Sequence, residues 1–189
     1  MLQRPVTTDM LAMDTPISVS LAPLAPGANA WSVTDAHLPT PWTGEVTLDN
    51  ALPDHPRPRS KRNRWLNLNG LWQFAGASEG EAPPFGAYLG EEILVLYPTE
   101  STLSGIDRHE EHMWYHLMIE VPRSWHAGDN WMLLYFGAVD YEATLWVNGQ
   151  RETKHTGSYG RFSTNITAAL ARSRLQEIIV SVTERTDAT

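Results

Sequence analysis

Three histidines lie within eight residues near the middle of the chain, at His109, His112 and His116. Imidazole nitrogens are common zinc ligands, so this spacing raises the hypothesis of a metal site. The helical zinc motif needs two histidines four residues apart with a glutamate directly after the first. Glu110 follows His109, but Met113 stands where the second histidine is needed, and His112 and His116 lead into a predicted strand. We therefore expect loop and strand-edge histidines, with no metal ligands and no cofactor.

Two carboxylates also occur at a spacing that could support chemistry. Asp140 and Glu142 are two residues apart and share one face of a predicted strand. Retaining hydrolysis of a glycosidic bond uses two carboxyl groups about 5 Å apart, whereas same-face neighbours on a strand are about 7 Å apart. No neighbouring residue marks either group for a raised pKa, so we interpret both as solvent-facing charges. The sequence then offers no catalytic residue.

The elements that must position such side chains are short strands. From 139 to 147 apolar and polar residues alternate, which is typical of a strand with one buried face. Asn148-Gly149 follows at once and predicts a tight hairpin, because both residues tolerate positive φ. The continuous apolar run 131–136 predicts a central strand buried on both faces, and 165–170 predicts a single helical turn. The predicted strands are 65–74, 92–96, 114–121, 131–136, 139–147, 150–155 and 177–183. Without a long amphipathic helix, this pattern indicates an all-β antiparallel sandwich.

The bulk composition excludes several classes of function. The chain has 189 residues and a net charge of −8, so it would repel a phosphate backbone and we expect no nucleic-acid partner. No cysteine is present, which removes disulfides and thiolate chemistry. No apolar run has the length of a bilayer span, so we expect no membrane partner. Eight tryptophans and six tyrosines could stack on sugar rings or fill a β-sandwich core.

Two parts of the chain are expected. Residues 1–50 read as an extended or disordered segment interrupted by prolines, with a weak signal peptide up to about residue 30 as the alternative. Residues 51–189 read as the β-sandwich domain. Its first residues carry a basic cluster from Arg57 to Arg64, which we interpret as a solvent-exposed segment leading into the domain and not as a localisation signal. The composition does not decide between a cytoplasmic and a secreted location.

Several segments, in order, resemble the N-terminal sugar-binding domain of glycoside hydrolase family 2, the β-galactosidase, β-glucuronidase and β-mannosidase group. The similarity covers about residues 40–187. The segments that carry it are Arg57-Pro58-Arg59, Trp65-Leu66-Asn67-Leu68-Asn69-Gly70-Leu71-Trp72-Gln73-Phe74, Tyr97-Pro98-Thr99-Glu100-Ser101-Thr102-Leu103-Ser104-Gly105-Ile106, Trp114-Tyr115 with Val121-Pro122 and Trp125, and Phe136 to Gln150 continuing into His155-Thr156-Gly157-Ser158-Tyr159 and Phe162-Ser163. The chain departs from the family pattern at Tyr141, Ser158 and Asn165, where tryptophan, glycine and aspartate are usual.

The resemblance implies a galactose-binding-like jelly roll, followed in the family by an immunoglobulin-like domain and a (β/α)₈ barrel that carries both catalytic glutamates. Such a barrel alone needs about 250 residues, so the resemblance assigns no catalytic residue to this chain. It implies instead that polar side chains at the rim of the sugar pocket come from Glu100, Ser101 and Thr102, and from Asp187. The implied partners are a β-linked saccharide and the immunoglobulin-like and barrel domains, with a homo-oligomer as an option.

Three functional hypotheses remain open at this point. The chain could be the sugar-binding part of a retaining β-glycosidase, inactive by itself. It could be a stand-alone carbohydrate-binding module, since it carries many aromatic residues on a sandwich that could fold alone. It could also be a docking domain, because a sandwich separated from its neighbours would expose apolar surface.

Overall fold

The computed structural model describes residues 30–34, 40–48, 64–125 and 130–185. Within these ranges the chain forms eight strands and four short 3₁₀ helices, and no α-helix. No helix among the described residues is long and apolar enough to cross a membrane. The apolar stretch 17–29, the basic residues 57–62 and Asp187 lie outside the described residues.

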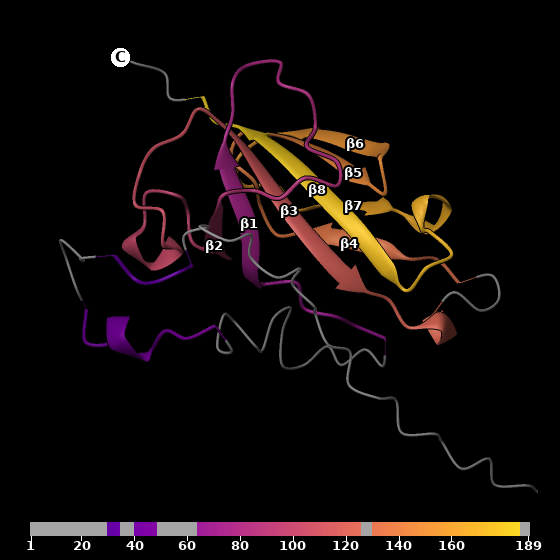
Figure 1. The fold of residues 1–189 in the computed structure, drawn as a ribbon, viewed down its shortest axis with the longest axis horizontal. Coiled ribbons are helices and arrows are strands. Elements are labelled where there is room, and N and C mark those ends of the chain that lie inside the picture. Colours follow the sequence, from indigo (N-terminus) through magenta and orange to yellow (C-terminus); the bar gives the residue numbers. More distant parts are fainter. Residues whose placement is uncertain (1–29, 35–39, 49–63, 126–129, 186–189) are drawn as a thin grey trace, which may run out of the picture.

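The strands form two antiparallel sheets (Figure 1). The larger sheet has six strands in the order β2-β1-β3-β8-β5-β6, and the smaller pairs β4 with β7. The strands are β1 Gly70–Gly76, β2 Glu91–Val95, β3 His112–Glu120, β4 Leu133–Phe136, β5 Glu142–Val147, β6 Gln150–Thr156, β7 Phe162–Asn165 and β8 Leu175–Thr183. The 3₁₀ helices are η1 Thr43–Glu45, η2 Thr102–Ser104, η3 Arg123–Trp125 and η4 Thr167–Ala169. The all-β antiparallel class is confirmed, while the jelly-roll connectivity stays a prediction.

One apolar core joins the two sheets. Alternate residues of the large sheet point into it, as period-2 patterning requires. Leu134 of the small sheet and Ile166 just after it belong to the same cluster of buried side chains. The members of that cluster are Trp72, Phe74, Ile93, Ile106, Met113, Leu117, Ile119, Val121, Leu134, Ala143, Leu145, Val147, Ile166, Ala169, Ile178, Val180 and Val182. The two sheets therefore share one core, as in a β-sandwich.

The opposite face of the large sheet is covered by the chain between β1 and β2. Leu89 packs there with Trp114 and Ile179 as a second buried cluster. Two backbone groups of this connection are held by side chains of the sheet: Leu89 N donates to Gln73 Oε1 at 3.1 Å, and Gly86 N donates to Glu177 Oε1 at 2.8 Å. Both faces of the large sheet are thus partly closed.

The predicted hairpin is confirmed. β5 and β6 are joined by Asn148 and Gly149, whose φ angles are +48° and +80°, and Val147 lies opposite Gln150. The predicted helical turn is confirmed as η4. The strands expected at 65–74 and 139–147 begin later than predicted, at Gly70 and at Glu142.

The prediction for 131–136 is wrong. β4 is not a central strand buried on both faces but one of only two strands in the small sheet. Leu134 faces the core, whereas Leu133 and Tyr135 are 40% and 44% exposed and Trp131 is 77% exposed. A continuous apolar run does not itself specify how many neighbours a strand has, because pairing depends on segments far along the chain.

Candidate functional site

The loop after β2 carries three of the residues expected to bind sugar, and it gives them different roles. Ser101 caps η2, its side chain accepting from Leu103 N at 3.3 Å. The carbonyl of Thr102 accepts from Thr34 N at 3.2 Å. The exposed carboxylate of Glu100 contacts the side chain of His109. The fourth expected residue, Asp187, lies outside the described residues.

Residues 30–34 contact the loop after β2, mainly through Trp31. Trp31 donates from its backbone N to Glu92 Oε2 at 3.1 Å and from its indole Nε1 to the carbonyl of Leu103 at 3.2 Å. Its ring lies so close to Gly105 that a Cβ there would be 2.4 Å from Trp31 Cδ1. Gly105 also has a φ of +86°, in the left-handed region that glycine adopts without strain. Residues 30–34 therefore pack on the β2–β3 connection.

Replacing Gly105 by alanine is expected to lower the free energy of unfolding by about 2 kcal/mol, because it adds left-handed backbone strain of about 1–2 kcal/mol to the clash with Trp31. Urea unfolding of the purified chain measures this loss. Gly44→Ala is the matched control, since a Cβ at Gly44 meets nothing within 4 Å. A Gly105→Ala variant as stable as Gly44→Ala would contradict the packing described for Trp31.

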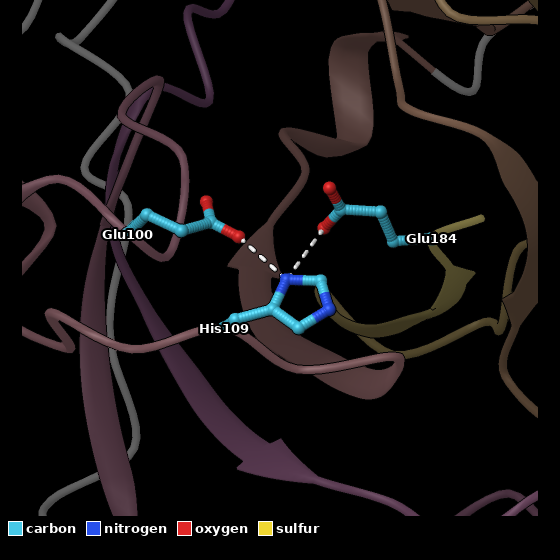
Figure 2. A group of neighbouring side chains, drawn as sticks. All are labelled: Glu100, His109 and Glu184. Atoms are coloured by element: carbon cyan, nitrogen blue, oxygen red, sulfur yellow. Dashed lines mark hydrogen bonds and ion pairs between the residues drawn. The ribbon is translucent and has the colours of Figure 1, made fainter. Parts of the chain in front are cut away.

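The candidate site is a cluster of Glu100, His109 and Glu184. His109 Nδ1 lies 3.0 Å from Glu100 Oε1 and 3.8 Å from Glu184 Oε2. Figure 2 shows both carboxylates turned toward this one ring nitrogen. One oxygen from each glutamate and one nitrogen of His109 all lie within 4.8 Å of one another. These three side chains come from the β2–β3 connection and from the residue after β8.

Strand pairing explains why these residues meet. β3 and β8 are antiparallel neighbours in the centre of the large sheet, with His112 opposite Thr183. The backbone of Glu184 continues this pairing, since its N donates to the carbonyl of Glu111 at 2.9 Å. The residues just before β3 must therefore lie beside the residues just after β8. The structure thus brings the loop of Glu100 beside Glu184, the residue after β8.

The electrostatics of the cluster are asymmetric. Partial burial pushes the pKa of Glu100 upward, but hydrogen bonds, above all with His109, outweigh burial and leave that pKa below its ordinary value. The hydrogen bond to Glu100 raises the pKa of the exposed His109. Partial burial and then the charge of Glu100 raise the pKa of Glu184, and Asp140 adds to the effect. His109 thus stabilises one carboxylate more than the other.

Sequence reasoning missed Glu184 and the role of His109. It treated His109 only as one of three histidines, and these do not come together. His112 Nδ1 lies 3.1 Å from Thr183 Oγ1, while His116 is buried, with Nδ1 3.2 Å from Gln73 Oε1 and Nε2 3.1 Å from Glu177 Oε1. The signal for Glu184 was the register between β3 and β8, which a single sequence does not display.

Glu142, interpreted from the sequence as a solvent-facing charge, is partly exposed and forms an ion pair. Its Oε1 lies 2.7 Å from Lys154 Nζ on the neighbouring strand. Asp140 precedes β5 and so does not share a strand face with Glu142 as predicted.

The described residues form an all-β sandwich with a polar side-chain cluster at one end of its larger sheet. Residues 91–189 match the family model described as glycosyl hydrolases family 2, sugar binding domain. The chain belongs to glycosyl hydrolase family 2, through this domain.

Relatives and solved structures agree with that assignment. A β-glucuronidase of Paenibacillus borealis is 25% identical over 123 residues, covering 61% of this chain and 20% of the relative. A β-glucuronidase of Canis lupus familiaris is 28% identical over 153 residues, covering 74% of this chain and 23% of the relative. The structure of a Faecalibacterium prausnitzii β-glucuronidase is similar with a TM-score of 0.55 and 26% identity, covering 65% of this chain and 21% of that one. The chain therefore spans about a fifth of the length of these relatives.

Proposed function

We propose that this chain is the sugar-binding N-terminal part of a retaining β-glycosidase, that it acts on β-linked saccharides only together with a catalytic barrel, and that it hydrolyses nothing by itself. The observation that carries this proposal is the family match over residues 91–189. The geometry supports it, because Glu100 of the predicted rim loop lies beside Glu184, three residues before Asp187. The proposed pocket-rim residues remain Glu100, Ser101, Thr102 and Asp187.

The relatives suggest which sugar to test first. They are named β-glucuronidases, and one similar solved structure, from Bifidobacterium dentium, is described as complexed with coumarin-3-O-glucuronide. That structure is 25% identical with a TM-score of 0.53 and is covered to 19% by this chain. We therefore include a β-glucuronide among the proposed ligands of the complete enzyme.

The purified 189-residue chain is expected to show no turnover of aryl β-glucuronides, β-galactosides or β-mannosides. The physical reason is that retaining hydrolysis needs a carboxyl pair about 5 Å apart on either side of the scissile bond, and the family resemblance places that pair in the barrel. Release of the chromophore, followed in each chromatographic fraction, measures the activity. Turnover that co-elutes with the chain and is lost in a Glu100→Gln, Glu184→Gln double variant would show that the chain has catalytic residues of its own and would contradict the proposal.

Calorimetric titration with glucuronate, galactose and mannose separates this proposal from a stand-alone binding module. A module must bind its sugar without help, whereas a pocket rim contributes only part of the contacts. Measurable binding at millimolar sugar that Glu100→Gln abolishes would favour the module. Glu120→Gln is the matched control, because Glu120 pairs with Arg174 at the far end of β3.

A docking role is favoured by one specific observation, the exposure of large aromatic side chains. Trp42, Trp131 and Tyr159 are 68%, 77% and 95% exposed. Aromatic residues are enriched at protein interfaces, so we propose that one or more of these side chains pack against further domains or a second copy. Light scattering of the purified chain tests it: a monomer that binds no hydrophobic dye would count against docking.

A further inference from the structure

In the cluster of Glu100, His109 and Glu184, one ring nitrogen of His109 lies near both carboxylates. His109 Nδ1 is 3.0 Å from Glu100 Oε1 and 3.8 Å from Glu184 Oε2 (Figure 2). A single proton on Nδ1 can form one good hydrogen bond, and 3.8 Å is too long for a second. Glu184 is therefore left with an ion-pair distance but no hydrogen bond from His109.

The two arginines next to the cluster in the sequence, Arg108 and Arg185, contact other side chains. Arg108 directs its guanidinium to Glu91 and Glu110, and Arg185 lies over the ring of Tyr141 at 5.8 Å. Among the described residues, the ion pairs of Glu100 and Glu184 are made with His109 alone. Glu100 and Asp140 in turn raise the pKa of Glu184 after the larger effect of its partial burial. The cluster thus holds more negative charge than one imidazolium can offset.

The hydroxyl of Tyr115 is also affected by the two carboxylates. Its hydroxyl donates to the thioether of Met113 at 3.4 Å, and a thioether is a weak acceptor. Burial, and then the charges of Glu100 and Glu184, raise the pKa of Tyr115. Both carboxylates therefore act electrostatically on the Tyr115 hydroxyl, in addition to the larger effect of burial on its pKa.

We propose that Glu100, His109 and Glu184 form a binding site for a divalent transition-metal ion, with Zn²⁺ as the best fit. Zinc bonds to nitrogen and carboxylate oxygen are about 2.0–2.2 Å long, which sets neighbouring tetrahedral ligands about 3.4 Å apart. The two distances from Nδ1, 3.0 and 3.8 Å, lie on either side of that value. The remaining pair of oxygens, within 4.8 Å, would approach by rotation of the Glu100 and Glu184 side chains, which are 44% and 23% exposed.

The donor set selects the class of ion. An imidazole nitrogen with two carboxylates suits zinc and its neighbours in the first transition row, while Ca²⁺ and Mg²⁺ need more oxygen ligands. Three protein ligands leave a coordination position open to water or to an oxygen of a bound molecule. This site does not depend on the proposed glycosidase role, since it uses only residues of the described sandwich.

Calorimetric titration of the metal-free chain with ZnCl₂ tests the site, with Co²⁺ absorption as the spectroscopic readout. We expect one strong site per chain, and at least about tenfold weaker binding in His109→Gln and in Glu184→Gln. His112→Gln is the matched control: it removes a histidine three residues away that contacts Thr183 instead. We expect it to leave Zn²⁺ affinity within about threefold of the wild type, since surface substitutions away from a site have small effects.

Each outcome decides the proposal. Selective loss in His109→Gln and Glu184→Gln, with the Co²⁺ band lost in the same variants, supports it. No Zn²⁺ binding at millimolar metal overturns it. Equal weakening by His112→Gln, or binding unchanged in His109→Gln, also overturns it, because the ion would then lie elsewhere. Both test residues are partly exposed, and circular dichroism checks that the variants keep the wild-type fold.

Discussion

Replacing Phe74 by alanine is expected to lower the free energy of unfolding by about 3–5 kcal/mol. Phe74 lies in β1, its side chain is fully buried, and its ring meets Tyr115 edge-on with centroids 5.4 Å apart. Truncation would remove that aromatic contact and leave a cavity where the two sheets share one core, and surrounding side chains relax into such cavities only in part.

Urea unfolding with unchanged m-value measures the Phe74→Ala effect. Phe74→Leu fills most of the volume, and a smaller loss is expected; this second variant stays measurable if the alanine variant does not fold. Tyr159→Ala is the control, because Tyr159 is 95% exposed and should change stability by no more than about 0.5 kcal/mol. Equal effects of Phe74→Ala and Tyr159→Ala would contradict the core described for the sandwich.

The second large effect is expected at Asn148. Replacing Asn148 by glycine should lower the free energy of unfolding by about 2–4 kcal/mol, because it removes three hydrogen bonds worth roughly 1 kcal/mol each. Asn148 Nδ2 donates to the carbonyl of Ala169 at 2.8 Å and to Gln176 Oε1 at 2.7 Å, and its Oδ1 accepts from Glu177 N at 2.9 Å. Gln176 is completely buried, so the three groups that lose their hydrogen bond to Asn148 cannot all form one with water instead.

Glycine is the informative substitution because it keeps the positive φ of Asn148 and removes only the side chain. Asn148→Asp keeps the acceptor for Glu177 N but sets a carboxylate oxygen against two acceptors, so an equal or larger loss is expected. Urea unfolding compares the two variants. An Asn148→Gly variant within about 0.5 kcal/mol of wild type would mean that Asn148 is needed only for its backbone conformation.

The sequence predicted the local features of this fold well. Alternating apolar residues predicted the faces of β3 and β8, and Asn148-Gly149 predicted the hairpin, because these signals lie within a few residues of one another. The error at 131–136 has a different cause. Burial of a strand's second face depends on which other segments pack over it, and Leu133 and Tyr135 remain 40% and 44% exposed.

The candidate site could be predicted only in part for the same reason. The family resemblance pointed to Glu100 and its loop, but the partners of Glu100 follow from the pairing of β3 with β8, which are far apart in the chain. Nothing local in the segment around Glu184 marks it as a neighbour of His109. Ser101 and Thr102 were expected in the same loop but do not join the cluster. The Ser101 side chain accepts from Leu103 N within the loop, and the Thr102 carbonyl accepts from Thr34 N.

The strand order of the large sheet has a consequence for biosynthesis. β8 is the last of the described strands along the chain, yet it lies between β3 and β5 and joins β2-β1-β3 to β5-β6. Until Leu175–Thr183 has left the ribosome, the earlier strands of the large sheet form two separate groups with unpaired edges. Such long-range pairing slows folding, and unpaired edges favour aggregation. Nascent chains stopped before β8 should therefore be recognised by chaperones and proteases, and the sandwich should form only when this strand closes the sheet.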